Sequence, residues 1–359
     1  MMSLPHPDRQ LILAIDAGGT KCTAVLATVN EGVIARGEAG PCNFSSIGLE
    51  NTITTIQTAI SNALSASTTT PTATTEPPPK FLVAWIGIAG LDITRPSDIA
   101  RIRPHLARSL GFEQEDSSSK NLIISSDAGL LSSVLIREQP TLTTAIVLVA
   151  GTGSIAHLYT TLSRNKTKTK TETESPSLVL PRTIARAGGW GYLLGDEGSG
   201  YDAGRRAIRA LLGAHDAGEP PTRLHKAVLE VLGCEDVKEV IAKVYGAAPK
   251  AIIASLSKVV MTLAFEEPDD EALGIVEEMV RSLVDLVLAL TRRAQREGVV
   301  KDNVALVCSG SLLVQVPRFR ESVVQKLKER APGIEFGKVF LVQDAAAYTA
   351  VALAECRKL

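Results

Sequence analysis

Short apolar runs alternate with amphipathic stretches along most of this 359-residue chain. Apolar runs predict buried strands at residues 11–15, 22–29, 81–88, 122–125, 145–150, 154–159, 304–309 and 338–342. Apolar residues at helical spacing predict helices at 49–64, 98–110, 128–137, 204–212, 221–232, 237–245, 251–265, 270–297, 316–330 and 345–356. Strands and helices mixed in this order predict an α/β fold.

One unit of this pattern occurs twice. Residues 11–29 form strand, Asp-Ala-Gly-Gly-Thr turn, strand, and residues 143–160 form strand, Ala-Gly-Thr-Gly-Ser turn, strand. A repeated unit in each half of a chain long enough for two domains predicts two related lobes. Two low-complexity segments, residues 65–79 and 163–177, lack apolar periodicity and are interpreted as solvated loops.

Composition removes several classes of function. The formal net charge is -1, so no overall basic field indicates nucleic-acid binding. Five scattered cysteines without a paired motif or zinc spacing indicate free thiols in a reducing compartment. No uncharged apolar run of about 18 residues occurs, so no membrane span is expected and the cytoplasm is the default location.

The first glycine-rich turn carries candidate phosphate-binding residues. Glycine lets backbone N–H groups approach phosphate oxygens closely. Because a strand and not a helix follows, the turn matches neither common phosphate-binding motif, and the phosphate would be held by a hairpin. Asp16, at the strand end, is the candidate for orienting a magnesium ion through water. The turn residues are Gly18, Gly19, Thr20 and Lys21; an ordinary hairpin turn is the alternative.

The second turn, Gly151, Thr152, Gly153 and Ser154, also lies between two predicted strands. Two donor-rich hairpins would hold a polyphosphate from both sides. The pair is therefore a more specific signal for nucleotide binding than either turn alone.

Asp127 lies where a predicted strand gives way to a predicted helix. A sugar hydroxyl is a weak nucleophile, and a carboxylate within hydrogen-bond reach can accept its proton as it attacks phosphorus. Helix capping is the alternative role, because aspartate is a favoured N-cap residue.

A third glycine-rich segment, residues 188–200, has six glycines in thirteen residues, too many for a regular helix or strand. The segment also contains Trp190 and Asp196, which suit a loop that lines a polar ligand better than a flexible linker. Gly310, after the strand at 304–309, would let a flat ring lie on the backbone; a simple strand-to-helix turn is the alternative.

Together these motifs resemble the sugar-kinase branch of the actin/Hsp70/hexokinase superfamily. Within it they are most similar to the N-acetylglucosamine kinases of the BadF/BadG-type ATPase family. The resemblance extends from Ile15 to the last helix, and its most specific part is Gly-Gly-Trp-Gly at 188–191 followed by Gly-Asp-Glu-Gly-Ser at 195–199. Two positions depart from the family pattern: Ile155 and Ala89 stand where polar residues are expected.

The resemblance implies a role for each motif. Asp127 matches the general base and a substrate contact, and Asp16 is the candidate magnesium residue. Nucleotide-binding positions are Gly18, Gly19, Thr20, Lys21, Gly151, Thr152, Gly153 and Gly310. Sugar-binding positions are Asn43, Ser154, Ile155, Gly189, Trp190, Gly191 and Asp196.

The implied fold is two actin-like, ribonuclease H-like lobes with an interlobe cleft. We expect residues 1–126 plus 345–359 to form the N-terminal lobe and 127–344 the C-terminal lobe. The implied activity is phosphorylation of N-acetyl-D-glucosamine at the 6-hydroxyl with ATP and Mg²⁺. Alternatives are a kinase for glucosamine or a muramic-type sugar, an ATPase that acts on a partner protein, and a non-catalytic sugar sensor. The expected partners are sugar and ATP, with no nucleic acid or membrane, and a homodimer is left open.

Overall fold

The structure is a computed structural model that describes residues 10–67, 80–91, 95–112, 121–162, 179–299, 304–331 and 336–358. The chain divides into two compact units. The first unit comprises Met1–Thr141, Ser163–Pro181 and Asp344–Leu359, and the second comprises Leu142–Leu162 and Arg182–Gln343. Most of both low-complexity segments, residues 68–79 and 163–177, lies outside the described residues.

The first unit is built on a five-stranded sheet in the order β3-β2-β1-β4-β5. The first three strands form an antiparallel meander, and β4 and β5 continue the sheet parallel to β1. The strands are β1 (Leu11–Ala17), β2 (Cys22–Thr28), β3 (Gly32–Ala39), β4 (Phe81–Ile88) and β5 (Leu122–Ser125). The parallel strands β1, β4 and β5 place their carboxyl ends along one edge.

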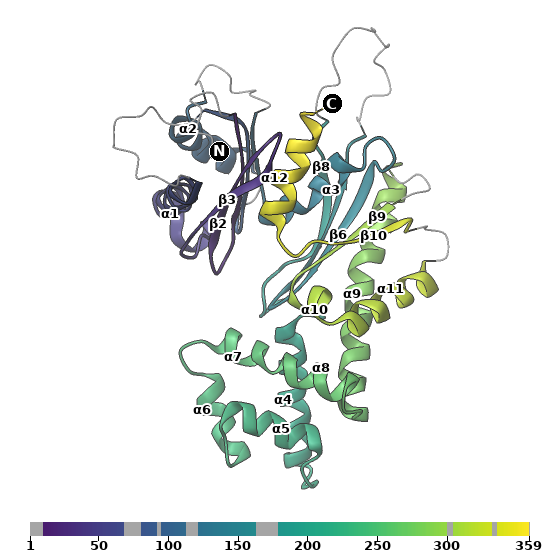
Figure 1. The fold of residues 1–359 in the computed structure, drawn as a ribbon. Coiled ribbons are helices and arrows are strands. Elements are labelled where there is room, and N and C mark those ends of the chain that lie inside the picture. Colours follow the sequence, from purple (N-terminus) through teal and green to yellow (C-terminus); the bar gives the residue numbers. More distant parts are fainter. Residues whose placement is uncertain are drawn as a thin grey trace, which may run out of the picture. The chain divides into compact units, whose positions relative to one another are not determined.

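Helices cover both faces of this sheet, because its central strands are apolar on both sides. Leu13 and Ile15 of β1 pack with α1 (Phe44–Ser67) and α2 (Pro96–Leu110) on one face. Figure 1 shows these two helices on the same side of the sheet. Ile12 and Ala14 pack on the other face with α12 (Ala345–Cys356) and the 3₁₀ helix η1 (Asp127–Ser133), which α3 (Val134–Arg137) follows.

The second unit has a sheet of the same kind, in the order β10-β9-β6-β7-β8. Its antiparallel meander is β6-β7-β8, and β9 and β10 continue parallel to β6. The strands are β6 (Thr144–Ala150), β7 (Ser154–Thr160), β8 (Arg182–Gly188), β9 (Val304–Ser309) and β10 (Lys338–Leu341). The repeated unit seen in the sequence is therefore a repeated sheet topology.

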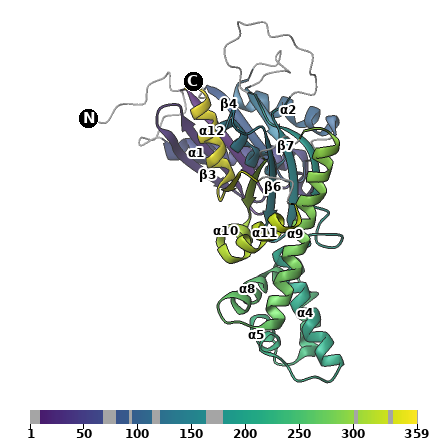
Figure 2. The same cartoon turned by 90° about the vertical axis from the view of Figure 1, so that its right-hand side faces the viewer.

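Helix α9 (Asp270–Arg296) connects the sheet of the second unit with a helical region. It packs on β7 and β8 and also on α4, α8 and α11, and Figure 2 shows it running from the sheet into this region. The other helices are α4 (Gly200–Asp216), α5 (Arg223–Leu232), η2 (Val237–Glu239), α6 (Val240–Val244), α7 (Pro249–Ser255), α8 (Ser257–Phe265), α10 (Ser311–Gln315) and α11 (Pro317–Arg330).

The predicted α/β class with two related lobes is confirmed, but several elements differ from the prediction. Strands β3 and β8 were not predicted, the helix expected at 128–137 begins as 3₁₀ helix, and the helix expected at 251–265 is broken at Leu256. Residues 65–67, expected in a loop, continue α1. Within the described part of the chain, no helix is long and apolar enough to span a membrane.

The units also divide at a different place from the expected lobes. The expected boundary followed residue 126, whereas the first unit extends to Thr141. Residues after 126 stay with the first unit because η1 and α3 pack against α12; the Thr349 hydroxyl donates to Leu130 O at 2.9 Å and lies 3.1 Å from the Ser133 hydroxyl. Asp127 is therefore part of the first unit.

Candidate active site

In the first unit, the predicted residues gather at the carboxyl edge of the parallel strands. Asp16 of β1 pairs in register with Gly87 of β4, and Gly87 pairs with Ser125 of β5. Asp127 follows Ser125 by two residues. In sheets of this type the carboxyl edge is where ligands bind, so the topology alone brings these side chains to a suitable place.

The first turn presents unused donors. Gly18 N donates to Lys21 O at 2.9 Å and closes the hairpin, and Lys21 pairs with Glu38. Gly19 and Thr20 at its tip are exposed, and among the described residues their amides donate to no acceptor. Neighbouring free amides with a hydroxyl in a tight turn form a suitable site for phosphate oxygens.

Asn43 is held next to this turn. Cys42 N donates to Gly18 O at 2.9 Å, which ties the segment before α1 to the first hairpin. The Asn43 side-chain oxygen accepts from the Ser45 hydroxyl at 2.7 Å and lies close to Gly90. A Cβ atom at Gly90 would lie 2.3 Å from that oxygen, so the glycine with φ 73° makes room for the asparagine. Hydrogen bonds thus fix the Asn43 carbonyl, and its NH₂ group stays available to a ligand.

Asp127 is the first residue of η1 and is only partly exposed. One carboxylate oxygen accepts from the adjacent Ala128 N at 2.9 Å. An N-cap side chain would instead accept from the second or third amide of the helix, and the Asp127 side chain makes no such bond. Burial raises the pKa of Asp127, while backbone N–H groups oppose the change. A carboxylate with a raised pKa and a free oxygen is suited to accept a proton.

Asp16 is a second acid group of this cluster with a raised pKa. Burial, followed by the negative charges of Asp127 and Asp344, raises its pKa to about 7, and Lys21 opposes the change. Asp344 belongs to the same cluster although it is distant in sequence: it caps α12 by accepting from Ala347 N at 2.8 Å, and it pairs with Arg36. Three carboxylates thus influence one another at this edge.

In the second unit, the second turn is braced by the glycine-rich loop. Gly151 N donates to Gly153 O at 2.9 Å, Gly200 N to Gly151 O at 2.7 Å, and Tyr201 N to Thr152 O at 3.3 Å. The first residues of α4 therefore hold the backbone of this hairpin in place.

Asp196 is the buried centre of this second cluster. It is 5% exposed and has φ 63°, a left-handed conformation that is uncommon for residues other than glycine. It accepts from Ser154 N at 3.2 Å and pairs with Lys250 Nζ at 3.2 Å. A Cβ atom at Gly153 would lie 2.8 Å from its carboxylate, so the turn needs glycine there. A conformation of this kind held by several contacts is typical of a functional site.

The loop that carries Trp190 leaves this side chain open to a ligand. Trp190 is 64% exposed, and the Arg186 guanidinium lies 4.5 Å from the centre of its ring. Gly189 N donates to Ser154 O at 3.2 Å, and Ile155 packs against Gly189, where a Cβ atom would lie 2.3 Å from the isoleucine Cδ1. Gly189 and Gly191 have φ of 70° and 83°.

Gly310 completes the second cluster. It follows β9 with φ 86°, and a Cβ atom would lie 2.4 Å from Ala150 O. Because β9 runs parallel to β6, this glycine comes next to the second turn. Glycine is therefore required here because the backbone of Ala150, at the end of β6, approaches so closely.

The predicted site residues thus form two clusters, one in each unit. The first-unit cluster contains Asp16, Gly18, Gly19, Thr20, Lys21, Asn43 and Asp127. The second-unit cluster contains Gly151, Thr152, Gly153, Ser154, Ile155, Gly189, Trp190, Gly191, Asp196 and Gly310. Whether these residues bind nucleotide and sugar stays a prediction.

The sequence reasoning missed two residues, Asp344 and Lys250. Asp344 had an available signal, because it precedes a helix after a strand, as Asp127 does. Lys250 had no such signal in the sequence, because only the position of α7 in the fold brings it to Asp196. Its Nζ also lies 5.5 Å from the centre of the Tyr192 ring.

The first-unit cluster suits a magnesium ion bound through water and phosphate. No group of three or more His, Cys, Asp or Glu side chains in the described ranges is arranged to hold a metal by itself. Mg²⁺ commonly keeps several waters and uses one or two carboxylates together with substrate phosphates. A cation near Asp16 would also offset the burial, and the repulsion from Asp127 and Asp344, that raise the pKa of this carboxyl. The donor set therefore fits.

Comparisons with known proteins agree with the resemblance, although no protein-family model matches the chain. It is 27% identical over 348 residues to an N-acetylmuramic acid/N-acetylglucosamine kinase of Clostridium acetobutylicum, covering 96% of this chain and 99% of the relative. It is 24% identical over 331 residues to an N-acetyl-D-glucosamine kinase of Dictyostelium discoideum, covering 91% and 93%.

Solved structures show the fold. A candidate N-acetylglucosamine kinase from Chromobacterium violaceum superposes with a TM-score of 0.61 at 20% identity, covering 96% of this chain and 99% of that one. A ROK family glucokinase from Streptomyces griseus gives 0.55 at 13% identity, covering 97% and 100%. The predicted resemblance to N-acetylglucosamine kinases is therefore confirmed over nearly the whole length, and the chain has the fold of the actin-like sugar kinases.

Proposed function

We propose that the chain is an ATP-dependent kinase that phosphorylates N-acetyl-D-glucosamine at the 6-hydroxyl. The observation that carries the proposal is Asp127, a partly buried carboxylate with a raised pKa and one unused oxygen beside the first turn. Its hydrogen bonds do not account for it as a helix cap. The names of the two relatives support the substrate class.

In this proposal Asp127 acts as the general base. The carboxylate accepts the proton of the sugar 6-hydroxyl while the oxygen attacks the γ-phosphorus of ATP. One oxygen–phosphorus bond forms, the bond to the β-phosphate oxygen breaks, and ADP leaves. Most of the rate comes from positioning and charge stabilisation, as is usual for phosphoryl transfer.

Each of the two turns would bind phosphate oxygens of ATP. Gly19 and Thr20 supply unused backbone amides and a hydroxyl, and Thr152 supplies the hydroxyl of the second turn. Gly310, next to the second turn, would contact the adenosine. Asp16 would hold Mg²⁺ through water, and this ion would neutralise negative charge on the phosphates. Asp16 must then be ionised, although its pKa is raised to about 7.

The remaining residues would select the sugar. Asn43 would offer its NH₂ group to a hydroxyl, and Asp196 would accept from sugar hydroxyls with the oxygen lone pairs that Ser154 N and Lys250 leave free. The exposed face of Trp190 would cover the acetyl methyl, while the loop backbone pairs with the amide. Glucose would lose these contacts.

N-Acetylmuramic acid is a second candidate substrate, because the relative from Clostridium acetobutylicum is named for both sugars. Glucosamine stays an alternative because a free amine would suit the carboxylates of Asp196 and Glu197.

A competition experiment tests the proposal. N-Acetylglucosamine, N-acetylmuramic acid, glucosamine and glucose are compared by ADP release at equal ATP. We expect a higher kcat/KM for N-acetylglucosamine than for glucose. If glucosamine is the best substrate, the loop around Trp190 is not an acyl site; if no sugar raises ADP release, the kinase assignment fails.

A further inference from the structure

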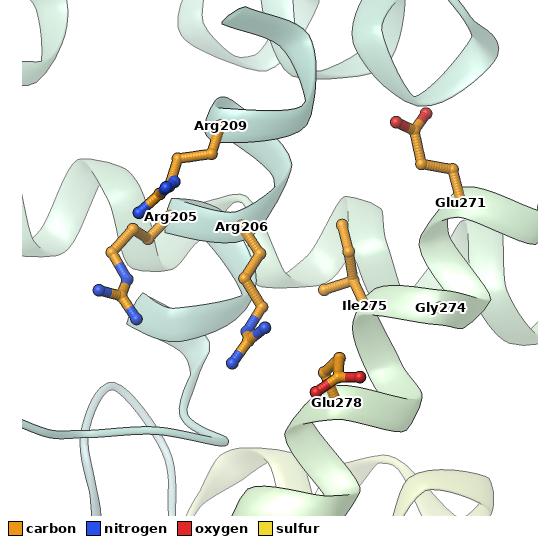
Figure 3. A pocket seen from close by; sticks show the side chains of 7 residues that line it. All are labelled: Arg205, Arg206, Arg209, Glu271, Gly274, Ile275 and Glu278. Carbon is orange, nitrogen blue, oxygen red and sulfur yellow. The ribbon is translucent and has the colours of Figure 1, made fainter. Parts of the chain in front are cut away.

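A pocket of about 470 Å³ lies at α4 and α9 of the second unit and contains none of the predicted site residues. Figure 3 shows three arginines on α4, with acidic and apolar residues on the neighbouring α9. The lining residues are Arg205, Arg206, Arg209, Glu271, Gly274, Ile275 and Glu278. Its volume is within the range of small-molecule sites.

The arginines concentrate positive charge on one stretch of helix. Arg205 and Arg209 are four residues apart, so they share one face of α4, where like charges repel. Arg205 and Arg206 each donate to the buried Asp202 carboxylate, at 2.9 and 3.0 Å. This carboxylate fixes two guanidinium groups but does not neutralise all three.

Hydrogen-bond donors are left over in this cluster. Arg209 makes no hydrogen bond or ion pair with any residue that the structure describes. Arg205 Nε is buried and has no partner there either. A buried donor without an acceptor is unfavourable, and an anion would satisfy it.

The acidic residues across the pocket already have partners. Glu271 accepts from the Thr222 hydroxyl at 2.8 Å and lies 3.1 Å from His225 Nε2. Glu278 accepts from Arg281 at 2.6 Å. Neither carboxylate pairs with Arg209; their basic partners are His225 and Arg281.

We propose that this pocket binds a phosphate monoester of a small polar molecule, with its phosphate on Arg205, Arg206 and Arg209. The guanidinium group is planar and matches phosphate with two parallel hydrogen bonds, and two of these groups are already fixed by Asp202. Gly274 leaves room on the α9 side, and Ile275 offers an apolar contact to the organic part. The proposal does not depend on the kinase assignment.

Isothermal titration calorimetry with glucose 6-phosphate, at low salt and without nucleotide, tests the site. We compare the wild type with Arg209→Gln and with the control Arg296→Gln, an exposed arginine of α9 outside the pocket. Arg209→Gln should weaken binding about tenfold or more, the scale of a lost charged hydrogen bond, and the control should bind like the wild type. Glucose 6-phosphate should also bind more tightly than inorganic phosphate.

Two results would overturn the proposal. Equal affinity of the wild type and Arg209→Gln would place the bound sugar phosphate elsewhere, for example at a product site. Inorganic phosphate that binds as tightly as glucose 6-phosphate would mean a site for the free anion. Both arginines are on the surface, and circular dichroism of each variant verifies that the fold is kept.

Discussion

Replacing Asp16 with asparagine should stabilise the protein at alkaline pH and do little at acid pH. Burial and the charges of Asp127 and Asp344 raise the pKa of Asp16 to about 7, from 3.8. Between these values the folded protein holds a proton that the unfolded chain has released. Stability is therefore lost as pH rises from about 4 to about 7, when the buried carboxyl must ionise. Asparagine keeps the shape and removes this ionisation.

The magnitude follows from the two pKa values. The difference between 3.8 and about 7 corresponds to about 4 kcal/mol of unfolding free energy when it is fully developed. Of this, about 2.5 kcal/mol should develop between pH 5 and pH 8, because part of the difference already lies below pH 5. The unfolding free energy of Asp16→Asn, relative to that of the wild type, should therefore be about 2.5 kcal/mol higher at pH 8 than at pH 5.

Urea unfolding of both proteins at the two pH values, with EDTA present, measures this difference. Asp216→Asn is the matched control, because Asp216 is exposed and makes no hydrogen bond or ion pair with the described residues. Its effect should be the same at both pH values. An Asp16→Asn effect that does not change with pH would refute the reasoning, since the Asp16 carboxyl would then titrate alike in the folded and unfolded chains.

Three further predictions concern the candidate site. Asp127→Asn should fold and still bind ATP by calorimetry, with kcat lower by at least ~10²-fold, and near-normal turnover would leave Asp127 without a role as a base. Lys250→Met should raise KM for the sugar by about tenfold or more, because the methionine leaves the buried Asp196 carboxylate without its lysine partner. Lys250→Arg should raise KM much less, and equal KM values for the wild type and Lys250→Met would show that Lys250 does not belong to the site. Gly310→Ala should lower the melting temperature more than Gly218→Ala. Both glycines have positive φ, but of the two only Gly310 would place a Cβ atom against backbone, at the end of β6. Equal decreases in melting temperature would show that the close approach of Gly310 to the β6 backbone does not disfavour a side chain.

The sequence predicted the central strands of each sheet well, because they are buried on both faces and are continuous apolar runs. It failed at β3 and β8, which lie at the meander edge of each sheet. These two strands are partly exposed and carry polar residues, such as Arg36 and Arg186, so their apolar pattern is interrupted.

In the candidate site, too, only features with a local sequence signal could be predicted. Turns such as residues 18–21 and 151–153 could be predicted because glycine and flanking strands are local signals. The contribution of Asp344 to the environment of Asp16 and the pairing of Lys250 with Asp196 depend on the fold, which joins residues far apart in the sequence. The predicted lobe boundary was likewise placed before η1, because the packing of η1 on α12 has no local signal.

The most direct test of the account is sugar-dependent release of ADP by the purified chain. With ATP, Mg²⁺ and N-acetylglucosamine, we expect ADP release well above the level without sugar and a phosphate ester at the 6-position by nuclear magnetic resonance. In the Asp127→Asn variant the rates of ADP release and of ester formation should both be lower by at least ~10²-fold. Wild-type protein that binds ATP and N-acetylglucosamine but transfers no phosphate would contradict the account.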